Sequence, residues 1–175
     1  MGEQAKPKII CYNIRMIIFI NGSINSGKTT VSKILMEKLG NFALIEIDSL
    51  CEMISWMPID KAVPINWENA VSVIKNFSKH GISSIIPYPI SQKNYDYVMA
   101  ELKDLNENIM VFTLAPKLES ALENRGTREL SDWEKERIKY HYEIGIPNPT
   151  FGEIIDNTDL TPEQTAEYIM EKINK

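Results

Sequence analysis

The chain has 175 residues, of which 43% are hydrophobic and 25% charged, and its net charge is −5. This length and composition are typical of one globular domain with a substantial core. The acidic balance and the lack of a basic stripe argue against a nucleic-acid-binding protein. The apolar stretch 9–20 contains Asn13 and Arg15, so it is too polar for a membrane span, and it lacks a signal-peptide cleavage region.

The residues before the first clear strand are interpreted as an N-terminal extension, 1–15, ahead of one domain that spans 16–175. This extension could be an extra strand, a loose arm or an addition before a natural start at Met16. Cys11 and Cys51 lack the spacing of a metal site, and reduced thiols fit the cytoplasm best, although a pairing between the two stays open. We expect a cytoplasmic monomer or homodimer that binds neither nucleic acid nor membrane.

The first predicted strand covers 16–20 and leads through a glycine-rich segment into a helix that ends near Leu39. The segment reads G-x-x-x-x-G-K-[ST], which is the spacing of a phosphate loop between a strand and a helix. Its two glycines let the backbone fold tightly around an anion, so that N–H groups and the positive helix end face the phosphates. The motif predicts a nucleoside triphosphate site, with contacts from Gly22, Ser23, Asn25, Ser26, Gly27, Lys28, Thr29 and Thr30.

Two residues at the end of this motif carry specific chemistry. Lys28 adds a positive charge that can follow the β- and γ-phosphates of the nucleotide. The Thr29 hydroxyl is placed to complete the coordination of Mg²⁺, which prefers oxygen ligands. Thr29 is therefore the expected metal ligand.

Strands and helices alternate along the rest of the chain. Apolar runs predict strands at 42–48, 82–87, 109–114 and 153–156. Apolar spacing and capping residues predict helices at 67–80, 91–105, 116–124 and 132–143, and a last one with Thr161 as N-cap and Pro162 at its first position. The segment 49–64 reads as irregular. Apolar strands that alternate with helices predict a three-layer α/β fold with a five-stranded parallel sheet.

Ligands of such a sheet gather at the carboxyl ends of its strands, and the second predicted strand ends at Asp48. Alternation places Asp48 on the same side as Glu46 and opposite Ile45 and Ile47. A carboxylate there could take the proton of a substrate hydroxyl as its oxygen attacks the γ-phosphate. Asp48 could instead cap a helix formed by the residues that follow, and the geometry must decide between the two.

The residues 20–30 together with 46–50 resemble the small phosphate-loop kinases of the nucleoside monophosphate kinase superfamily. The nearest likenesses are the chloramphenicol phosphotransferases and the gluconate- and shikimate-kinase-like proteins. The resemblance implies ATP, Mg²⁺, the strand order 2-3-1-4-5 and a small lid. In the chloramphenicol phosphotransferases an Asp-Ser-Leu after the second strand carries the catalytic base, and Asp48 matches that position. The implied reaction is transfer of the γ-phosphoryl group to a hydroxyl of a small molecule.

The charged stretch after the fourth predicted strand is similar in order to the lid of those kinases. By this match Arg125 would lie over the adenine, and Arg128 and Arg137 would neutralise charge on the transferring phosphoryl group. The expected catalytic set is then Lys28, Asp48 and Arg128. Arginines and glutamates interleaved on a helix also commonly form a solvated, mutually paired face, and this alternative stays open.

Two further positions are interpreted through the resemblance. Asp156 and Asn157 follow the last predicted strand, where the family contacts the adenine, and both are also ordinary turn residues. The third predicted strand ends in Pro87-Tyr88-Pro89, with no carboxylate where many relatives hold Mg²⁺ through water. Either Asp48 serves the metal as well, or the nucleotide's own oxygens and waters hold it beside Thr29, or catalysis has been weakened.

The acceptor pocket is expected along the segment after Asp48 and the loop after the third strand. Aromatic and methionine side chains there could accept a partly apolar molecule, but such residues more often belong to the core. They are Met53, Trp56, Met57, Trp67, Tyr88 and Tyr95. Neither His80 nor His141 shows the pattern of a ligand or a base.

Two other functions stay open at this stage. A nucleoside or nucleotide kinase would need arginines to hold the acceptor phosphate, and the region 48–81 has none. A nucleotide-binding regulatory protein with little turnover is suggested by the missing acid of the third strand.

Overall fold

The computed structural model describes residues 15–123 and 129–174. Within these ranges, parallel strands form one five-stranded sheet in the order β2-β3-β1-β4-β5. This arrangement confirms the predicted α/β fold and strand order. The strands are β1 (Met16–Gly22), β2 (Phe42–Leu44), β3 (Ser83–Pro87), β4 (Asn108–Leu114) and β5 (Glu153–Ile155).

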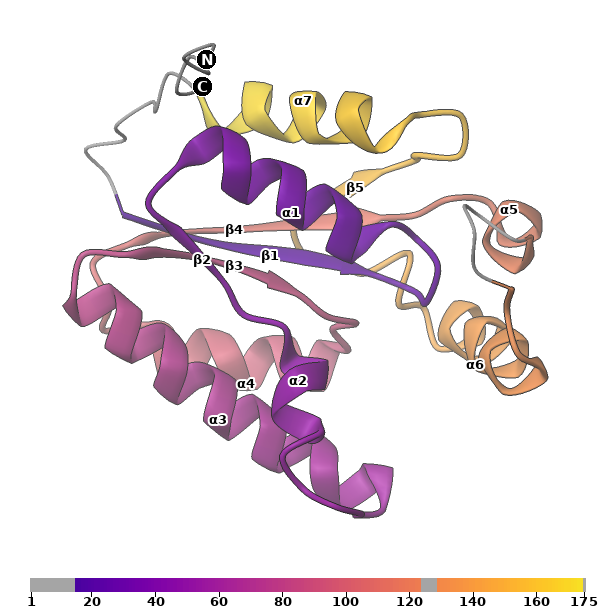
Figure 1. Cartoon of the computed structure of the whole chain (residues 1–175), viewed down its shortest axis with the longest axis horizontal. Coiled ribbons are helices and arrows are strands. Elements are labelled where there is room, and N and C mark those ends of the chain that lie inside the picture. The colour runs from indigo at the N-terminus through magenta and orange to yellow at the C-terminus, as the bar shows by residue number, and fades with distance from the viewer. Residues whose placement is uncertain (1–14, 124–128, 175) are drawn as a thin grey trace, which may run out of the picture.

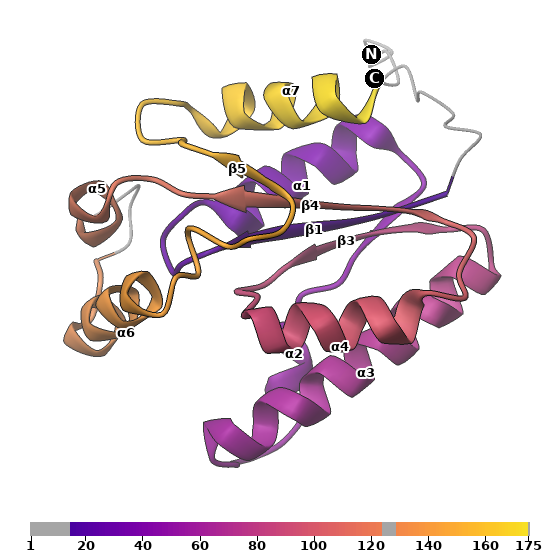
Figure 2. The ribbon, with the colours of Figure 1, turned by 180° about the vertical axis from the view of Figure 1, so that it is seen from behind.

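Helices cover both faces of the sheet and give it three layers (Figures 1 and 2). One face is covered by α1 and α7, the other by α3 and α4, and α5 and α6 lie past the carboxyl ends of the strands. The short α2 packs against α3. The bounds are α1 (Lys28–Leu39), α2 (Ile47–Cys51), α3 (Ile59–Lys79), α4 (Gln92–Leu102), α5 (Leu118–Leu122), α6 (Asp132–Glu143) and α7 (Pro162–Ile173).

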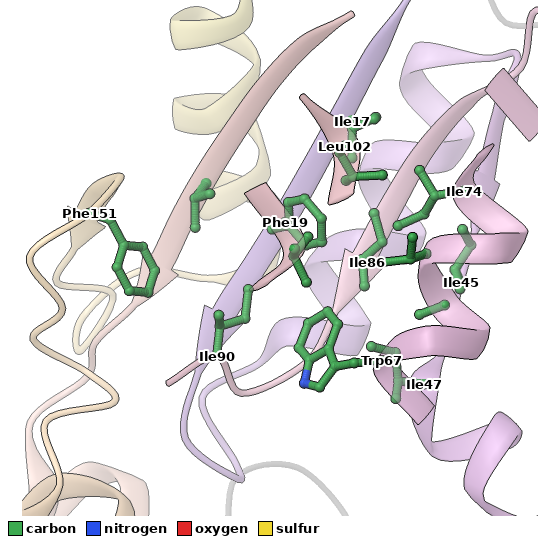
Figure 3. Packing of buried hydrophobic residues seen from close by; sticks show 14 residues of the cluster. Ile17, Phe19, Ile45, Ile47, Trp67, Ile74, Ile86, Ile90, Leu102 and Phe151 are labelled. Atoms are coloured by element: carbon green, nitrogen blue, oxygen red, sulfur yellow. The ribbon is translucent and has the colours of Figure 1, made fainter. Parts of the chain in front are cut away.

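The central strand β1 divides its side chains between two hydrophobic cores. Ile17 and Phe19 face α3 and α4 and pack in the cluster that contains Trp67 (Figure 3). Ile18 and Ile20 face the opposite way, against α1 and α7. Successive side chains of a strand point to opposite faces, so a strand covered on both sides must be apolar throughout. This requirement explains the unbroken apolar run before the phosphate loop.

The second strand is shorter than predicted, because β2 ends at Leu44 and Ile47 begins α2. The amide of Ile45 still donates to the carbonyl of Ile85 at 2.9 Å, after which the chain leaves the sheet. Ile45 and Ile47 are both buried, at 5% and 0% exposure. The apolar alternation therefore continues beyond the last paired residue, and the predicted strand 42–48 was too long for this reason.

Helix α3 begins at Ile59 and includes Pro64, whereas the sequence predicted an irregular segment up to that proline. Proline lacks the N–H that would bond to the carbonyl four residues earlier, which usually ends or kinks a helix. Here Pro64 and Asp60 are both exposed, so water can serve the unpaired carbonyl. The helix starts of α4, α6 and α7 agree with the prediction to within one residue, and Thr161 caps α7 as expected.

Only Arg15 of the predicted N-terminal extension lies within the described residues. Its carbonyl accepts from the amide of Asn108 at 3.1 Å, and its guanidinium donates to the carbonyl of Ser78 at 2.9 Å. The domain division at residue 15 therefore stays a prediction. Among the described helices, none has the length and apolar character that crossing a membrane requires.

Candidate active site

The phosphate loop has the backbone conformation that its glycines predict. Gly22 and Gly27 have φ values of +141° and +94°, which residues other than glycine rarely adopt. At Gly22 a Cβ would lie 2.5 Å from the carbonyl oxygen of Leu114 and 2.6 Å from Ser26 Oγ. The first glycine is therefore required both by its φ and by the close approach of β4.

Side chains from distant segments hold the loop in place. Asn25, at a φ of +62°, donates from Nδ2 to the carbonyls of Ala121 and Glu123 at 2.9 and 2.8 Å. Asn157 donates from Nδ2 to the carbonyl of Ser26 at 3.0 Å. The loop is thus anchored to the end of α5 and to the connection that follows β5.

Lys28 folds back onto the loop and donates from Nζ to the carbonyl of Ser23 at 2.7 Å. Burial lowers the pKa of Lys28 to about 8, and the carboxylate of Asp48 opposes that shift. The hydroxyl of Ser26 is buried and has no hydrogen-bond partner among the described residues. A cradle with an unsatisfied hydroxyl and a lysine beside it fits the phosphates of a nucleotide.

Asp48 lies in the first turn of α2 and faces the cleft described below. The N-cap of that helix is Glu46, which makes no side-chain capping bond, so the capping interpretation of Asp48 is wrong. The Asp48 side chain is exposed to the cleft, yet the cleft walls withhold part of its hydration, and this desolvation raises its pKa. Lys28 lowers that pKa, whereas Glu46 and Glu52 raise it further.

An open cleft of about 1020 Å³ extends from Lys28 and Thr29 between two walls. One wall comes from α2, α3 and the segment between them, and the other comes from α6 and the residues after it. Among the predicted pocket residues, Trp56, Met57 and Tyr88 line this cleft. Burial raises the pKa of Tyr88 to about 12, so its phenol stays neutral at physiological pH.

The other three predicted pocket residues do not line the cleft. Trp67 is 1% exposed and belongs to the core (Figure 3). Its ring meets that of Tyr88 edge-on, with the centroids 5.5 Å apart. Tyr95 stacks on Phe151 with ring centroids 3.9 Å apart. Met53 is 79% exposed and lies outside the cleft. The pocket interpretation is therefore wrong at these three positions, and for Trp67 and Tyr95 the core alternative holds.

His141 is a site residue that the sequence did not reveal. It lies on α6, is 5% exposed, and its Nδ1 is 3.3 Å from Ser23 Oγ of the phosphate loop. Burial lowers the pKa of His141 to about 4, helped by the charges of Arg137 and Lys28, so the ring is neutral at pH 7. Its contact joins the helix beyond the sheet to the loop that would hold the phosphates.

The carboxamide of Asn21, directly before the phosphate loop, is fully hydrogen-bonded and buried. Its Nδ2 donates to Thr113 Oγ1 at 3.0 Å and to the carbonyl of Ile146 at 3.2 Å. Its Oδ1 accepts from the amide of Ile90 at 2.7 Å. Asn21 therefore ties β1 to β4, to the segment between β3 and α4, and to Ile146 on the cleft wall that follows α6.

The wall between α2 and α3 contains a free thiol. Asn66 of α3 donates from Nδ2 to Cys51 Sγ, which joins the two helices. Burial raises the pKa of the Cys51 thiol, so it stays protonated. Its possible partner Cys11 lies outside the described residues.

Comparison with known proteins adds evidence on the fold. No protein-family model and no curated protein matches the chain. Solved structures match it over most of its length. One is the tunicamycin resistance protein of Deinococcus radiodurans, with 22% identity and a TM-score of 0.62 over 91% of this chain and 95% of that one. A sugar kinase from Janibacter has 14% identity and a TM-score of 0.68 over 92% of this chain and 95% of that one. A gluconokinase from Sinorhizobium meliloti has 12% identity and a TM-score of 0.65 over 93% of this chain and 98% of that one.

This chain has the fold of the phosphate-loop kinases. Two residues that the resemblance placed in the lid of that fold, Arg125 and Arg128, lie outside the described residues. Arg137 lines the cleft, with its Cζ 4.9 Å from the ring centroid of Tyr140. Because His141 follows Arg137 by four residues, both lie on one helix face, and that spacing is the signal that could have revealed His141.

The remaining predicted residues of the kinase fold take different positions. Thr29 is exposed on the cleft, whereas Thr30 is exposed outside it. Asp156 accepts from the amide of Thr158 at 3.0 Å and so forms an ordinary turn, while Asn157 binds the phosphate loop. Within the described ranges, no group of three or more acidic, histidine or cysteine side chains is placed to hold a metal ion.

Proposed function

We propose that the protein is an ATP- and Mg²⁺-dependent phosphotransferase that moves the γ-phosphoryl group of ATP to a hydroxyl of a small molecule. The observation that carries this proposal is the placement of Lys28 and Asp48 on one open cleft, within electrostatic reach of each other. A transfer site needs a cation for the phosphates and a base for the acceptor at the same place. Structural neighbours named as a sugar kinase and a gluconokinase support the same class of reaction.

The phosphate loop would receive the nucleotide through an exchange of partners. The Lys28 ammonium, which donates to the carbonyl of Ser23, would turn to the β- and γ-phosphate oxygens. The unsatisfied hydroxyl of Ser26 lies in the same loop and would gain an acceptor. Because the loop is anchored by Asn25 and Asn157, little backbone ordering is left to oppose binding.

Asp48 would act as the base. Its carboxylate takes the proton of the acceptor hydroxyl as that oxygen bonds to the γ-phosphorus and the bond to the bridging β–γ oxygen breaks. The products are a phosphorylated acceptor and ADP. The raised pKa of Asp48 makes the carboxylate a stronger proton acceptor than a fully solvated one.

Mg²⁺ fits the oxygen donors at the cleft. The Thr29 hydroxyl is the side chain that would hold it, beside the oxygens of the nucleotide. The ion, when bound, neutralises charge on the phosphates. A single side-chain donor suits an ion that usually keeps several waters and binds through substrate phosphates.

Asp48→Asn tests this function directly. We expect transfer of labelled phosphate from ATP to hydroxyl compounds to fall roughly 10²- to 10⁴-fold, while ATP affinity, measured by calorimetry, stays within about threefold. Glu46→Gln is the matched control, because it removes a carboxylate beside Asp48 that does not line the cleft. Its transfer rate should stay close to that of the unmodified protein.

Two outcomes would decide against the proposal. If Asp48→Asn transferred phosphate at the normal rate, Asp48 would not be the base. If the protein bound ATP tightly and phosphorylated no tested hydroxyl, it would be a nucleotide-binding protein, as the missing acid at the end of β3 suggests. A nucleotide acceptor is disfavoured because 48–81 contains no arginine to hold its phosphate.

A further inference from the structure

Exposed apolar side chains gather on the cleft. Ten large hydrophobic side chains are exposed in the described part of the chain, and five of them line this one cleft. They come from both walls: Trp56 (80% exposed), Ile59 (52%), Trp133 (62%), Tyr140 (44%) and Ile144 (49%). A group of exposed apolar side chains in one cleft indicates a binding site, because apolar surface is unfavourable in water and becomes covered when a ligand binds.

This apolar part of the cleft is available to the acceptor. Among the described residues, none from β5 or from the connection to α7 lines the cleft, and that is where the resemblance places the adenine. The triphosphate would occupy the end at Lys28 and Thr29. The walls that carry Trp56 and Trp133 are left for the molecule that meets Asp48.

The charge on the acceptor wall selects against anions. The wall from α2 and α3 contributes two carboxylates, Asp48 and Glu52, and no cation. The described cations on the cleft are Lys28 and Arg137, which both lower the pKa of His141 beside the phosphate loop. Arg137 also lies within electrostatic reach of Tyr88 and one helical turn after Trp133 on α6. A bound triphosphate would neutralise them, which leaves an anionic acceptor facing carboxylates and phosphates.

We propose that the acceptor subsite takes a hydroxyl compound with a large aromatic or alkyl body and no anionic group. This inference rests on the proposed phosphotransferase function and narrows its substrate class. The compound is neutral or carries an amine, its apolar body packs between Trp56 and Trp133, and its hydroxyl reaches Asp48. Small polyols, sugar acids and nucleotides lack one or both of these features.

Two matched pairs of compounds test the proposal on the full chain with Mg²⁺ and a non-hydrolysable ATP analogue. Phenyl glucoside and glucose differ in the phenyl group, so this pair tests the contribution of the apolar body. Phenylalaninol carries an amine and phenyllactate a carboxylate, so this pair tests the effect of ligand charge. By saturation-transfer NMR and calorimetry, we expect the first member of each pair to bind at least about tenfold more tightly. Equal binding within either pair, or the reverse order, would overturn the proposal.

Substitutions show whether the named residues cause these preferences. Trp56→Ala should weaken phenyl glucoside about fivefold or more, whereas Met53→Ala should not, although the two side chains are equally exposed at 80% and 79%. Glu52→Gln should reduce the ratio of the affinities for phenylalaninol and phenyllactate, and it should leave the affinity for phenyl glucoside unchanged. If Trp56→Ala and Trp133→Ala changed the sedimentation coefficient but not ligand binding, the apolar surface would be a protein interface and the proposal wrong.

The same samples separate this inference from the function on which it rests. With ATP in place of the analogue, binding in the expected order without phosphate transfer would refute the phosphotransferase and leave the chemistry of the subsite standing. Phosphate transfer to glucose or gluconate, with no preference for the phenyl compounds, would refute the subsite and leave the phosphotransferase standing.

Discussion

The two ends of the cleft are built in opposite ways. At the phosphate end, side chains of Asn25, Asn157 and His141 connect the loop to three distant segments. At the acceptor end, Trp56 and Trp133 stand largely in solvent. Under the proposed function, the nucleotide would meet a preformed surface, while the acceptor would cover side chains that the free protein leaves exposed. Affinity for the nucleotide would then depend on preorganisation, and selectivity for the acceptor would depend on the apolar walls.

The largest effect is expected from a comparison of two tryptophans, Trp67 in the core next to Tyr88 and Trp56 at the acceptor end. Trp67→Ala should lower the free energy of unfolding by about 3–5 kcal/mol because it opens a cavity in the core. Trp56→Ala should change it by less than about 0.5 kcal/mol because the side chain is 80% exposed. Urea denaturation measures both. A large loss for Trp56→Ala would show that this end is as firmly built as the phosphate end.

Gly22→Ala tests the rigidity of the phosphate end. The new Cβ would meet a backbone oxygen at 2.5 Å, so we expect a loss of about 3 kcal/mol in unfolding free energy and of ATP binding. Gly81→Ala is the control, because its φ of +74° is similarly unfavourable but nothing lies within 4 Å. It should cost only about 1 kcal/mol. Equal losses would mean that the close approach of β4 is not important.

Lys28 makes the phosphate end sensitive to pH. Its pKa of about 8 in the free protein should rise when phosphates bind, so ATP binding at pH 8.5 should take up roughly half to three-quarters of a proton. Calorimetry in buffers of different ionisation enthalpy measures this number. Lys28→Met should abolish the uptake, and an unchanged uptake would assign the proton to another group.

The same shift affects folding. The unfolded chain has the ordinary lysine pKa of 10.5 and holds more protons than the folded one above pH 8. The free energy of unfolding should therefore rise between about pH 8 and 10.5 in the free protein, and Lys28→Met should remove that rise.

The smallest effect concerns the link between α6 and the loop. A double-mutant cycle with Ser23→Ala and His141→Ala should give a coupling of about 1 kcal/mol for their hydrogen bond. Because the folded pKa of His141 is about 4, below its ordinary 6.5, stability should fall as the pH drops through that window. Thermal melts of His141→Gln should show a flatter pH dependence. Zero coupling would leave α6 independent of the loop.

The parts of the site that could be predicted from sequence are local ones. The phosphate loop and its helix follow from eight consecutive residues whose spacing reflects backbone geometry. The contact of His141 with Ser23 spans 118 residues, and the bonds of Asn21 span up to 125. No local pattern reports such pairs, because they depend on how the layers pack.

The spacing around the two tryptophans in the sequence distinguishes their positions. Trp67 is followed by Ala70, Val71 and Ile74, which is the spacing of one helix face, and all four are buried. Trp56 has no such neighbours and lies outside the helices. Helical spacing could therefore have assigned Trp67 to the core and left Trp56 for the cleft.

The single carboxamide of Asn21 has a kinetic consequence. The amide hydrogen of Ile90 can exchange with solvent only after its bond to Asn21 opens, and the same side chain holds the segment at Ile146. Both segments should therefore open together as one local unfolding unit. The rate of hydrogen exchange at Ile90 should then report how often these two segments open, and a ligand that binds to both cleft walls should lower that rate.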